Sequence, residues 1–304
     1  MYDIVIIGAG PAGLTAAIYA RRADKSVLVL ERETFGGQIT HSPKIENYPG
    51  FIEMSGNELG EKLIEQALHQ GAEIELDTAV SIGGTPGNYT VKGEAGEYQA
   101  KSVIIAAGSH HRKLGLEKEE RFTGEGISYC AVCDGAFYKG KDVAVIGGGN
   151  SALQEAILLS KTSKSVTLIQ NLDFLTGEKK LCEDVMKADN ISVIYSSTVS
   201  SIEGDDTFEG IVIENTASGE KQLIKVDAVF VAIGQMPENE PFRNVVQLDE
   251  RGYIISGEDC KPEGVTEGIF TAGDCRSKKI RQVATAVSDG AVAALAACSF
   301  IDSL

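Results

Sequence analysis

The residues best suited to chemistry are Cys130 and Cys133, which are two residues apart and are followed directly by Asp134. A dithiol at this spacing can cycle between a disulfide and two thiols, and its thiolate can attack another disulfide. The neighbouring carboxyl group could donate or accept the proton that such an exchange needs. A structural disulfide that closes so small a loop would add little stability. We therefore favour a redox role over a structural disulfide or two buried thiols.

The other cysteines and the histidines do not form a metal-binding pattern. Cys182, Cys260, Cys275 and Cys298 are scattered, and the four histidines do not repeat at ligand spacing. A zinc site would need a second cysteine pair or histidines close by. We therefore predict no metal site, and we interpret the scattered cysteines as core thiols.

A glycine-rich segment near the start of the chain stands where a strand would pass into a helix. Residues 3–7 form a continuous apolar run, a helical stretch follows at about 11–23, and a second apolar strand at 26–30 ends at Glu31. This is the order of a βαβ dinucleotide-binding unit, with an acidic residue about twenty positions after the glycines. We therefore expect a bound dinucleotide and not merely a glycine turn.

Three glycines of this segment have separate tasks in such a unit. Gly8 permits a tight turn, Gly10 lets the backbone approach a pyrophosphate, and Gly13 allows close packing of helix and strand. The N-terminus of the helix favours the phosphate charge, and Glu31 can accept hydrogen bonds from a ribose.

The same plan occurs a second time after the dithiol. A strand at 142–146 precedes the glycine-rich residues 147–152, and a helix at 151–160 and a strand at 165–169 follow. Between the two units, residues 72–107 alternate in short segments broken by glycines, which predicts an antiparallel meander.

These patterns predict an α/β protein with two Rossmann-like (ββα) nucleotide-binding domains, the second inserted in the first. We assign residues 1–112 and 242–304 to the discontinuous first domain and residues 113–241 to the inserted domain, which carries the dithiol. Hinges are expected at 109–115 and 235–241. An alanine-rich helix from about 282 to 300 is interpreted as buried against a sheet.

Composition and charge restrict the partners. The net charge of −16 repels nucleic acid and anionic membranes. No uninterrupted apolar run reaches the roughly 18 residues that a membrane-spanning helix needs. The first residues enter a strand without a basic leader, so no secretory signal is indicated. We expect a cytoplasmic protein that binds neither nucleic acid nor membranes.

Taken together, the motifs resemble those of the low-molecular-weight thioredoxin reductases over nearly the whole chain. They occur in the family's order: Gly8–Gly13, Gly36–Gln38, Glu46–Gly50, Cys130–Gly135, Gly147–Ala152, Ala272–Asp274 and Arg281–Gln282.

This resemblance implies FAD in the first domain, a homodimer, and a dithiol that passes electrons to thioredoxin. It implies that Cys133 faces the flavin, that Cys130 attacks the substrate disulfide and that Asp134 is the acid-base group. Asp274 would hold the ribityl chain or the pyrophosphate, and Arg281 with Gln282 would lie along the isoalloxazine and ribityl region. The flavin-binding residues that it implies are Gly8, Gly10, Pro11, Ala12, Gly13, Glu31, Gly37, Gln38, Asn47, Val80, Ala107, Gly108, Gly273, Asp274, Arg281, Gln282 and Val283.

The second unit departs from the NADPH-using members, which clamp the 2′-phosphate with three arginines after its second strand. Asn171, Leu172 and Thr176 occupy those positions here, and Asp173 adds a negative charge. Hydrogen bonds to a charged group contribute roughly 1.5–3 kcal/mol each. Losing two would lower the affinity for NADPH by about a hundredfold to ten-thousandfold.

NADH is not favoured either. Gln170 stands at the strand end where a ribose-binding acid is expected, and Gln154 replaces a glutamate that is usual in the family. The chain is thus most similar to the flavin-dependent ferredoxin-thioredoxin reductases, and we expect reduced ferredoxin as the electron donor. The basic clusters at 110–113 and 276–281 are candidate docking sites, with solvated surface charge as the alternative.

Three other functions remain open. NADPH or NADH could bind through unusual contacts. A dithiol oxidase would pass electrons to oxygen, although such relatives usually carry histidine where Asp134 stands. A non-catalytic flavin-binding sensor is disfavoured by the intact dithiol. The family resemblance also implies that the inserted domain rotates so that one dithiol can meet both the flavin and its protein substrate.

Overall fold

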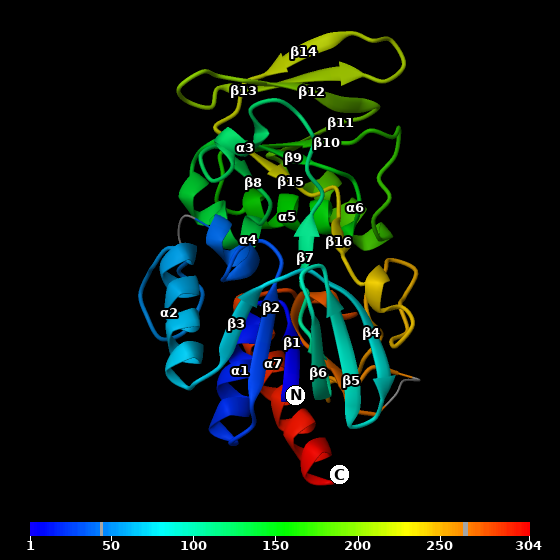
Figure 1. The fold of residues 1–304 in the computed structure, drawn as a ribbon. Helices are drawn as coiled ribbons and strands as arrows, with labels where there is room; N and C mark the ends of the chain where they lie inside the picture. Colours follow the sequence, from blue (N-terminus) through cyan, green and yellow to red (C-terminus); the bar gives the residue numbers. More distant parts are fainter. Residues whose placement is uncertain (43–44, 264–266) are drawn as a thin grey trace. The chain divides into compact units, whose positions relative to one another are not determined.

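The computed structural model describes residues 1–42, 45–263 and 267–304, and the chain forms two compact units. One comprises Met1–His110 with Met236–Leu304, and the other comprises His111–Gln235 (Figure 1). The chain passes from one to the other through β7 (Ser109–His111) and returns through β16 (Gln235–Pro237), and these short strands pair with each other. The predicted α/β class with an inserted second unit is therefore confirmed.

The first unit is built on a sheet with the strand order β3-β2-β1-β6-β5-β4, in which β17 also pairs with β6. β1 is parallel to β2 and β6, whereas β4, β5 and β6 form the expected antiparallel meander. The strands are β1 (Tyr2–Ile7), β2 (Val27–Glu31), β3 (Glu73–Leu76), β4 (Ala79–Thr85), β5 (Asn88–Gly93), β6 (Glu97–Ile105) and β17 (Ile269–Thr271).

Alternate residues of β1 enter two separate cores. Ile4 and Ile6 pack with α1 and α7, whereas Val5 and Ile7 pack with residues of the meander. Burial on both faces explains the continuous apolar run of this strand. The helices of the unit are α1 (Pro11–Arg22), α2 (Gly56–His69) and α7 (Val283–Asp302), with 3₁₀ helices η1 (Gly37–His41), η3 (Glu240–Phe242) and η4 (Gly273–Cys275).

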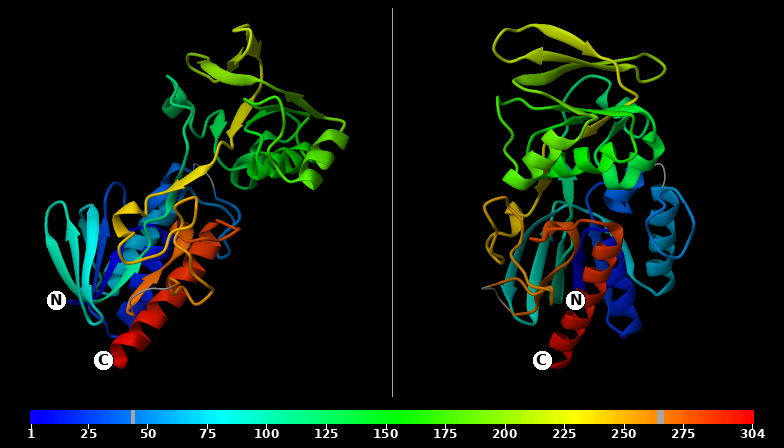
Figure 2. Two further views of the ribbon diagram at one scale, coloured as in Figure 1. Left: turned by 90° about the vertical axis from the view of Figure 1, so that its right-hand side faces the viewer. Right: turned by 180° about the vertical axis from the view of Figure 1, so that it is seen from behind.

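Helix α7 is a core element. It packs against α1, β6 and β17, and Figure 2 shows it beside α1. The two helices approach closely because Gly290 has no side chain: a Cβ there would lie 2.2 Å from the Ala12 carbonyl oxygen. Among the described residues, α7 is the one helix long and apolar enough to cross a membrane by length and composition. Its packing within the first unit accounts for its apolar character.

The second unit has a five-stranded parallel sheet in the order β11-β10-β9-β15-β8. Val143 and Val145 of β9 face α5, whereas Ala144 and Ile146 face an antiparallel layer of β12, β13 and β14. The strands are β8 (Ile127–Ser128), β9 (Asp142–Ile146), β10 (Ser165–Ile169), β11 (Ile191–Ile194), β12 (Ser197–Glu203), β13 (Gly210–Asn215), β14 (Lys221–Ile224) and β15 (Ala228–Val231). The helices are α3 (Glu119–Phe122), α4 (Ala131–Asp134), η2 (Gly135–Tyr138), α5 (Asn150–Ser160) and α6 (Lys179–Lys187).

Candidate active site

Cys130 and Cys133 form a disulfide at the start of the one-turn helix α4. The turn brings their Cα atoms to 5.3 Å. The Cys133 amide donates a hydrogen bond to Cys130 Sγ at 3.2 Å, and the Asp134 amide donates to the Cys130 carbonyl at 3.0 Å. Because the pair is local in sequence and is held by its own backbone, the turn can be kept in both redox states.

Asp134, the last residue of α4, has two different carboxyl oxygens. Oδ2 accepts a hydrogen bond from the Ser128 hydroxyl at 2.7 Å. Oδ1 is buried and has no hydrogen-bond partner in the described part of the chain. Burial raises the pKa of Asp134, and the Ser128 hydrogen bond opposes part of this rise. A carboxyl group that holds its proton beside a dithiol is suited to general acid-base work.

Sequence reasoning missed a buried contact that anchors the segment before the dithiol. The Tyr129 hydroxyl donates to Glu119 at 2.8 Å, and burial together with this hydrogen bond raises the pKa of Tyr129. Glu119 also accepts hydrogen bonds from the amides of Leu114 and Gly115 at 2.7 and 2.8 Å. The residue next to Cys130 is thus tied to the chain that enters this unit.

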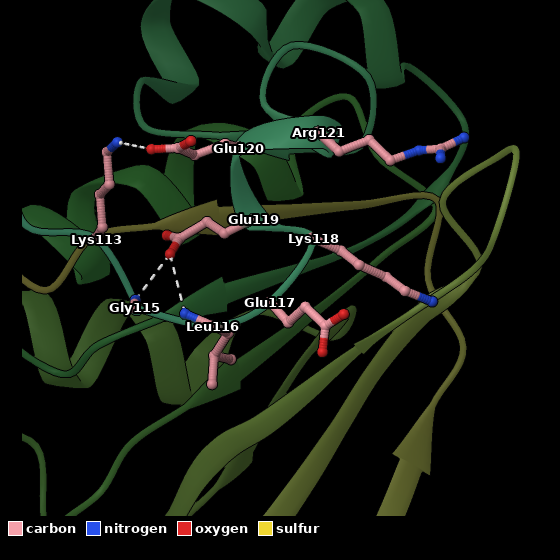
Figure 3. Close-up of a pocket in the computed structure, with 8 residues that line it drawn as sticks. All are labelled: Lys113, Gly115, Leu116, Glu117, Lys118, Glu119, Glu120 and Arg121. Carbon is pink, nitrogen blue, oxygen red and sulfur yellow. Dashed lines mark hydrogen bonds and ion pairs between the residues drawn. The ribbon is translucent and has the colours of Figure 1, made fainter.

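Figure 3 shows the surroundings of Glu119, which borders an open cavity of about 440 Å³. Lys113 pairs there with Glu120 at 2.8 Å. The cavity lining carries charges of both signs: Lys113, Gly115, Leu116, Glu117, Lys118, Glu119, Glu120 and Arg121. This mixed lining points to no particular ligand.

The first glycine-rich loop is shaped as the sequence predicts. Gly8 has φ +107°, and a Cβ there would lie 2.3 Å from the Ala106 carbonyl oxygen. A Cβ at Gly13 would lie 1.8 Å from the Gly8 oxygen, whereas a Cβ at Gly10 would meet nothing within 4 Å. The first and third glycines are therefore required for packing, while the second leaves the backbone at the start of α1 open to a ligand.

Glu31 supports this loop from the end of β2. Its buried carboxylate accepts hydrogen bonds from the amides of Ala9 at 2.7 Å and Glu33 at 3.0 Å. Carboxylate oxygens have further lone pairs, so Glu31 can still accept from a ribose hydroxyl.

Several other sequence-predicted flavin residues converge on the start of α1. A Cβ at Gly37 would lie 3.0 Å from the Gly10 Cα, and one at Gly273 would lie 2.8 Å from the Ala12 Cβ. Loops that follow parallel strands of one sheet meet at its carboxyl edge, which explains this convergence. Gly8–Gly13 follow β1, Gly37 and Gln38 lie in η1, Ala107 and Gly108 follow β6, and Gly273 and Asp274 lie in η4. Val80 differs, because it lies in the meander strand β4.

The remaining predicted residues surround η4 and the start of α7. Asn47 donates to the side chain of Gln282 at 3.3 Å, and Val283 is the first residue of α7. Asp274 Oδ1 is buried and has no partner among the residues described, and burial raises its pKa to about 6. A buried acceptor of this kind calls for a ligand hydroxyl or another polar group.

The predicted basic cluster at 276–281 is largely occupied by internal contacts. Asp289 of α7 pairs with Arg276 at 2.8 Å and with Lys278 at 2.8 Å, and all three side chains are about 10% exposed. The Arg281 guanidinium lies 4.0 Å from the centre of the Tyr253 ring. Arg276 and Lys278 are therefore not surface charges, which corrects the sequence-based expectation, whereas Lys279 is exposed.

The second glycine-rich loop repeats the backbone of the first. Gly147 has φ +130°, and a Cβ there would lie 2.5 Å from the Ala232 oxygen. The amide of Thr176 donates to the Gly148 oxygen at 2.8 Å, just as the amide of Gly36 donates to the Ala9 oxygen at 2.9 Å. Gln170 directly follows the last residue of β10, near the position that Glu31 takes at the end of β2.

The side chains around the second loop differ from those of the first. The Gln170 carboxamide is buried; it donates to the Phe174 carbonyl at 3.0 Å and accepts from the Asn171 amide at 3.1 Å. It lies 2.4 Å from where a Cβ of Gly148 would be. The Thr176 hydroxyl donates to the Gly148 oxygen at 3.1 Å. Gln170 and Thr176 thus contact their own glycine loop, whereas residues 171–174 are exposed.

The chain has two βαβ units. The first has an open glycine loop, and the second carries a disulfide beside a buried acid. Together they define a disulfide oxidoreductase with two nucleotide-binding domains. The family model described as "Pyridine nucleotide-disulphide oxidoreductase" matches residues 2–290. The chain belongs to this family, among the low-molecular-weight thioredoxin reductases, as predicted.

Its relatives match over the full length. The chain is 43% identical over 300 residues to the "34.2 kDa protein in rubredoxin operon" of Clostridium pasteurianum, covering 98% of this chain and 97% of that protein. It is 39% identical over 305 residues to the thioredoxin reductase of Bacillus subtilis, covering 100% and 96%. The crystal structure of thioredoxin reductase from Streptococcus pyogenes superposes with a TM-score of 0.95 at 38% identity, covering 100% and 99%.

Members of this family are FAD-binding flavoproteins, and FAD is the cofactor of this chain. The residues described above fit that group. Gly10 leaves room for a pyrophosphate at the start of α1, Glu31 provides acceptors for a ribose, and Asp274 has a buried oxygen to which no described residue donates a hydrogen bond. When bound, FAD supplies the electron pair that reduces a disulfide.

Proposed function

We propose that this protein reduces the disulfide of thioredoxin through Cys130 and Cys133, with electrons that come from reduced ferredoxin and not from NADPH. The observation that carries the choice of donor is the neutral Gln170 at the strand end of the second unit, whose carboxamide is already bonded to Phe174 and Asn171. The reductase scaffold is kept, while the second unit lacks the charged side chains that would hold a nicotinamide dinucleotide.

The first and second glycine loops of this chain can be compared directly. Glu31 is a carboxylate, which makes a strong hydrogen bond with a ribose hydroxyl. Gln170 is neutral, and its side-chain amide and carbonyl groups are already hydrogen-bonded to Phe174 and Asn171. Gly10 and Gly149 are equivalent, because each is the N-cap of the helix that follows its loop, and a Cβ at Gly149 would meet only Thr176 Oγ1, at 3.8 Å. The two loops therefore differ in the side chain at the strand end and not in the space beside this glycine. The contrast favours a dinucleotide in the first unit and disfavours one in the second.

The missing charges add to this effect. Asn171, Leu172 and Thr176 stand at the three arginine positions of NADPH-using members. Two lost charge-assisted hydrogen bonds correspond to about 3–6 kcal/mol, which would place NADPH outside useful affinity.

The dithiol can perform the exchange with its own groups. Two electrons and two protons convert the Cys130–Cys133 disulfide into two thiols, and Asp134 can deliver one of the protons. The Cys130 thiolate then attacks a thioredoxin sulfur, the other thioredoxin sulfur leaves as a thiol after protonation, and a mixed disulfide forms. Cys133 attacks the Cys130 sulfur, which restores the internal disulfide and releases the second thioredoxin thiol. In this proposal Cys133 is the cysteine that faces the flavin.

Ferredoxin suits the donor role because a flavin can collect two single electrons before a disulfide takes both. Ferredoxins are typically acidic, and this chain is acidic overall, so docking requires a local cation. Exposed Lys279 lies in the loop between η4 and α7, beside the proposed flavin residue Arg281, and Ile280 is 63% exposed. We propose this short segment as part of the donor-docking surface.

The remaining assignments are part of the same proposal. The unit of residues 1–112 and 242–304 binds FAD, residues 113–241 form the inserted domain with the dithiol, and two chains form a homodimer in the cytoplasm. The residues proposed to hold FAD are those named from the family resemblance, from Gly8 to Val283.

The donor is tested by anaerobic bleaching of the flavin absorbance with NADPH, NADH and photoreduced ferredoxin in parallel, followed by thioredoxin addition. We expect rapid bleaching with ferredoxin alone and reoxidation by thioredoxin. The Cys130→Ser variant should still bleach but should not transfer electrons to thioredoxin. Rapid bleaching by micromolar NADPH would refute the proposed donor. Oxygen consumption with small dithiols, without thioredoxin turnover, would indicate a dithiol oxidase instead.

A further inference from the structure

A second buried carboxyl group, Glu155, lies against the dithiol turn. Helix α5 packs on α4, and the backbone amide of Ala131, the first residue of α4, lies near enough to the Glu155 carboxyl group to favour its charged form. Its Oε2 atom is buried and lacks a hydrogen-bond partner in the portion of the chain that the structure describes. An ionised oxygen in this position would be costly, so the site favours the neutral acid.

The position of the contact relates Glu155 to Cys130. The Ala131 amide belongs to the peptide bond that joins Cys130 to α4, so a charge on Glu155 lies close to this cysteine. The Cys133 amide, two residues further on, donates to Cys130 Sγ. We propose that Glu155 is a positioning residue for the dithiol: it holds the first turn of α4 through the Ala131 amide and, once ionised, opposes formation of the Cys130 thiolate.

The protonation state of Glu155 gives this arrangement a pH dependence. Burial raises the pKa of Glu155 to about 8, and the Ala131 amide opposes part of the rise. At neutral pH the group is therefore mainly neutral and leaves Cys130 free to ionise. At higher pH two negative charges would be close together. For two like charges within about 10 Å at an effective dielectric constant of about 20, such a repulsion corresponds to a shift of at least about one pH unit.

Other ionisable groups lie on the elements that pack on α5, namely α4, α6, β9 and β10. α4 carries Asp134, which is hydrogen-bonded to Ser128, and Cys133, which becomes ionisable when the disulfide is reduced; Asp142 of β9 pairs with Lys164. β10 has no ionisable side chain, and α6 carries Lys179, Lys180, Cys182, Glu183, Asp184 and Lys187, in which Lys180 pairs with Asp184 and Lys187 with Glu183. Burial and the Ala131 amide are the two influences that set the protonation of Glu155.

The test compares the wild type with Glu155→Gln, which keeps an acceptor for the Ala131 amide and removes the charge. The holoenzyme is reduced anaerobically with a phosphine, and alkylation of Cys130 by iodoacetamide is followed by peptide mass spectrometry between pH 5 and 10. Wild type should show two ionisation steps, because Glu155 and Cys130 titrate as a coupled pair. The variant should lose the step that Glu155 contributes, and its Cys130 midpoint should be lower by about one pH unit.

Glu125→Gln is the matched control, because it removes the same charge from an exposed side chain of the same unit. It should leave the profile unchanged. The proposal is overturned if the pH midpoint of Cys130 alkylation is the same in wild type and Glu155→Gln, or if Glu125→Gln shifts it equally. It is also overturned if the wild type shows a single ionisation step. This last result needs no variant, so it decides even if Glu155→Gln does not fold. Chemical reduction bypasses the electron donor, so this result is independent of the ferredoxin assignment.

Discussion

The Ser128 hydroxyl donates a 2.7 Å hydrogen bond to Oδ2 of Asp134, while Oδ1 of the same carboxyl group is buried and unpaired within the described residues. The hydrogen bond from Ser128 favours the carboxylate, whereas burial of Oδ1 favours the neutral acid. The net effect is a raised pKa of Asp134, so burial is the larger influence. The acid therefore keeps its proton to higher pH than a surface aspartate.

Replacement of Asp134 by asparagine should slow thioredoxin reduction by about 10²–10⁴-fold, because the carboxyl proton is lost as a general acid. Flavin content and melting temperature should stay near those of the wild type. The measurement is stopped-flow oxidation of the reduced enzyme by thioredoxin across pH.

Ser128→Ala is the informative companion to Asp134→Asn. It removes the hydrogen bond that favours the charged form, so the pKa of Asp134 should rise further and the alkaline limb of the rate profile should move to higher pH. A limb that moves to lower pH would show that another group controls it.

Gly10→Ala should weaken FAD binding by about tenfold or more, because a methyl group would stand where the backbone must approach the pyrophosphate. The apoprotein should melt as before, since a Cβ at Gly10 meets nothing within 4 Å. Fluorescence titration of apoprotein with FAD gives the affinity.

Two further glycine substitutions serve as controls for Gly10→Ala. Gly13→Ala places a Cβ 1.8 Å from the Gly8 oxygen and should destabilise the whole first unit. Gly83→Ala meets nothing within 4 Å on an exposed strand and should change neither property. If Gly10→Ala binds FAD like the wild type, the pyrophosphate lies elsewhere.

Asn171→Arg, Leu172→Arg and Thr176→Arg together should tighten binding of adenosine 2′,5′-bisphosphate by about a hundredfold, as expected for two restored charge-assisted hydrogen bonds. Calorimetry against adenosine 5′-monophosphate isolates the effect of the 2′-phosphate. The triple glutamine variant at the same positions should gain nothing. Micromolar binding of the bisphosphate by the wild type would contradict the absence of a clamp.

Lys279→Glu should lower kcat/KM for ferredoxin several-fold at low salt, and the effect should fade as ionic strength screens the exposed charge. Lys278→Met should act differently, because Lys278 is buried against Asp289. Its loss should lower stability by about 1–3 kcal/mol and flavin content with it, with little dependence on salt. Equal salt dependence in both variants would refute the assignment of a docking role to Lys279 and a structural role to Lys278.

Glu155 should make stability depend on pH. Its pKa is raised from 4.5 to about 8 in the folded state, so the folded protein binds this proton more tightly than the unfolded chain. The contribution is fully present below 4.5 and is lost as pH rises to about 8. Relative to Glu155→Gln, the free energy of unfolding of the wild type should fall across this range by on the order of 3–5 kcal/mol. Parallel urea titrations would show it, and parallel curves for the two proteins would exclude it.

The fold could be predicted because its signals are local. The apolar run of β1 requires burial on both faces, and the glycine spacing at Gly8, Gly10 and Gly13 fits only a tight strand-to-helix turn. The basic cluster could not be judged in the same way. From the sequence, Arg276 and Lys278 are expected to be surface charges, but in the fold both pair with Asp289 of α7.

The sequence by itself determined the spacing of the two cysteines, the two glycine loops and the absence of arginine at positions 171, 172 and 176, because each depends on residue identity at short spacing. Tertiary structure decided which polar groups are buried and what they meet: Glu155 against the Ala131 amide, and Gln170 against Gly148. The reason is physical. The free energy of a charge or a hydrogen-bonding group depends on its neighbours in space and on its distance from water, and those neighbours come from distant parts of the chain.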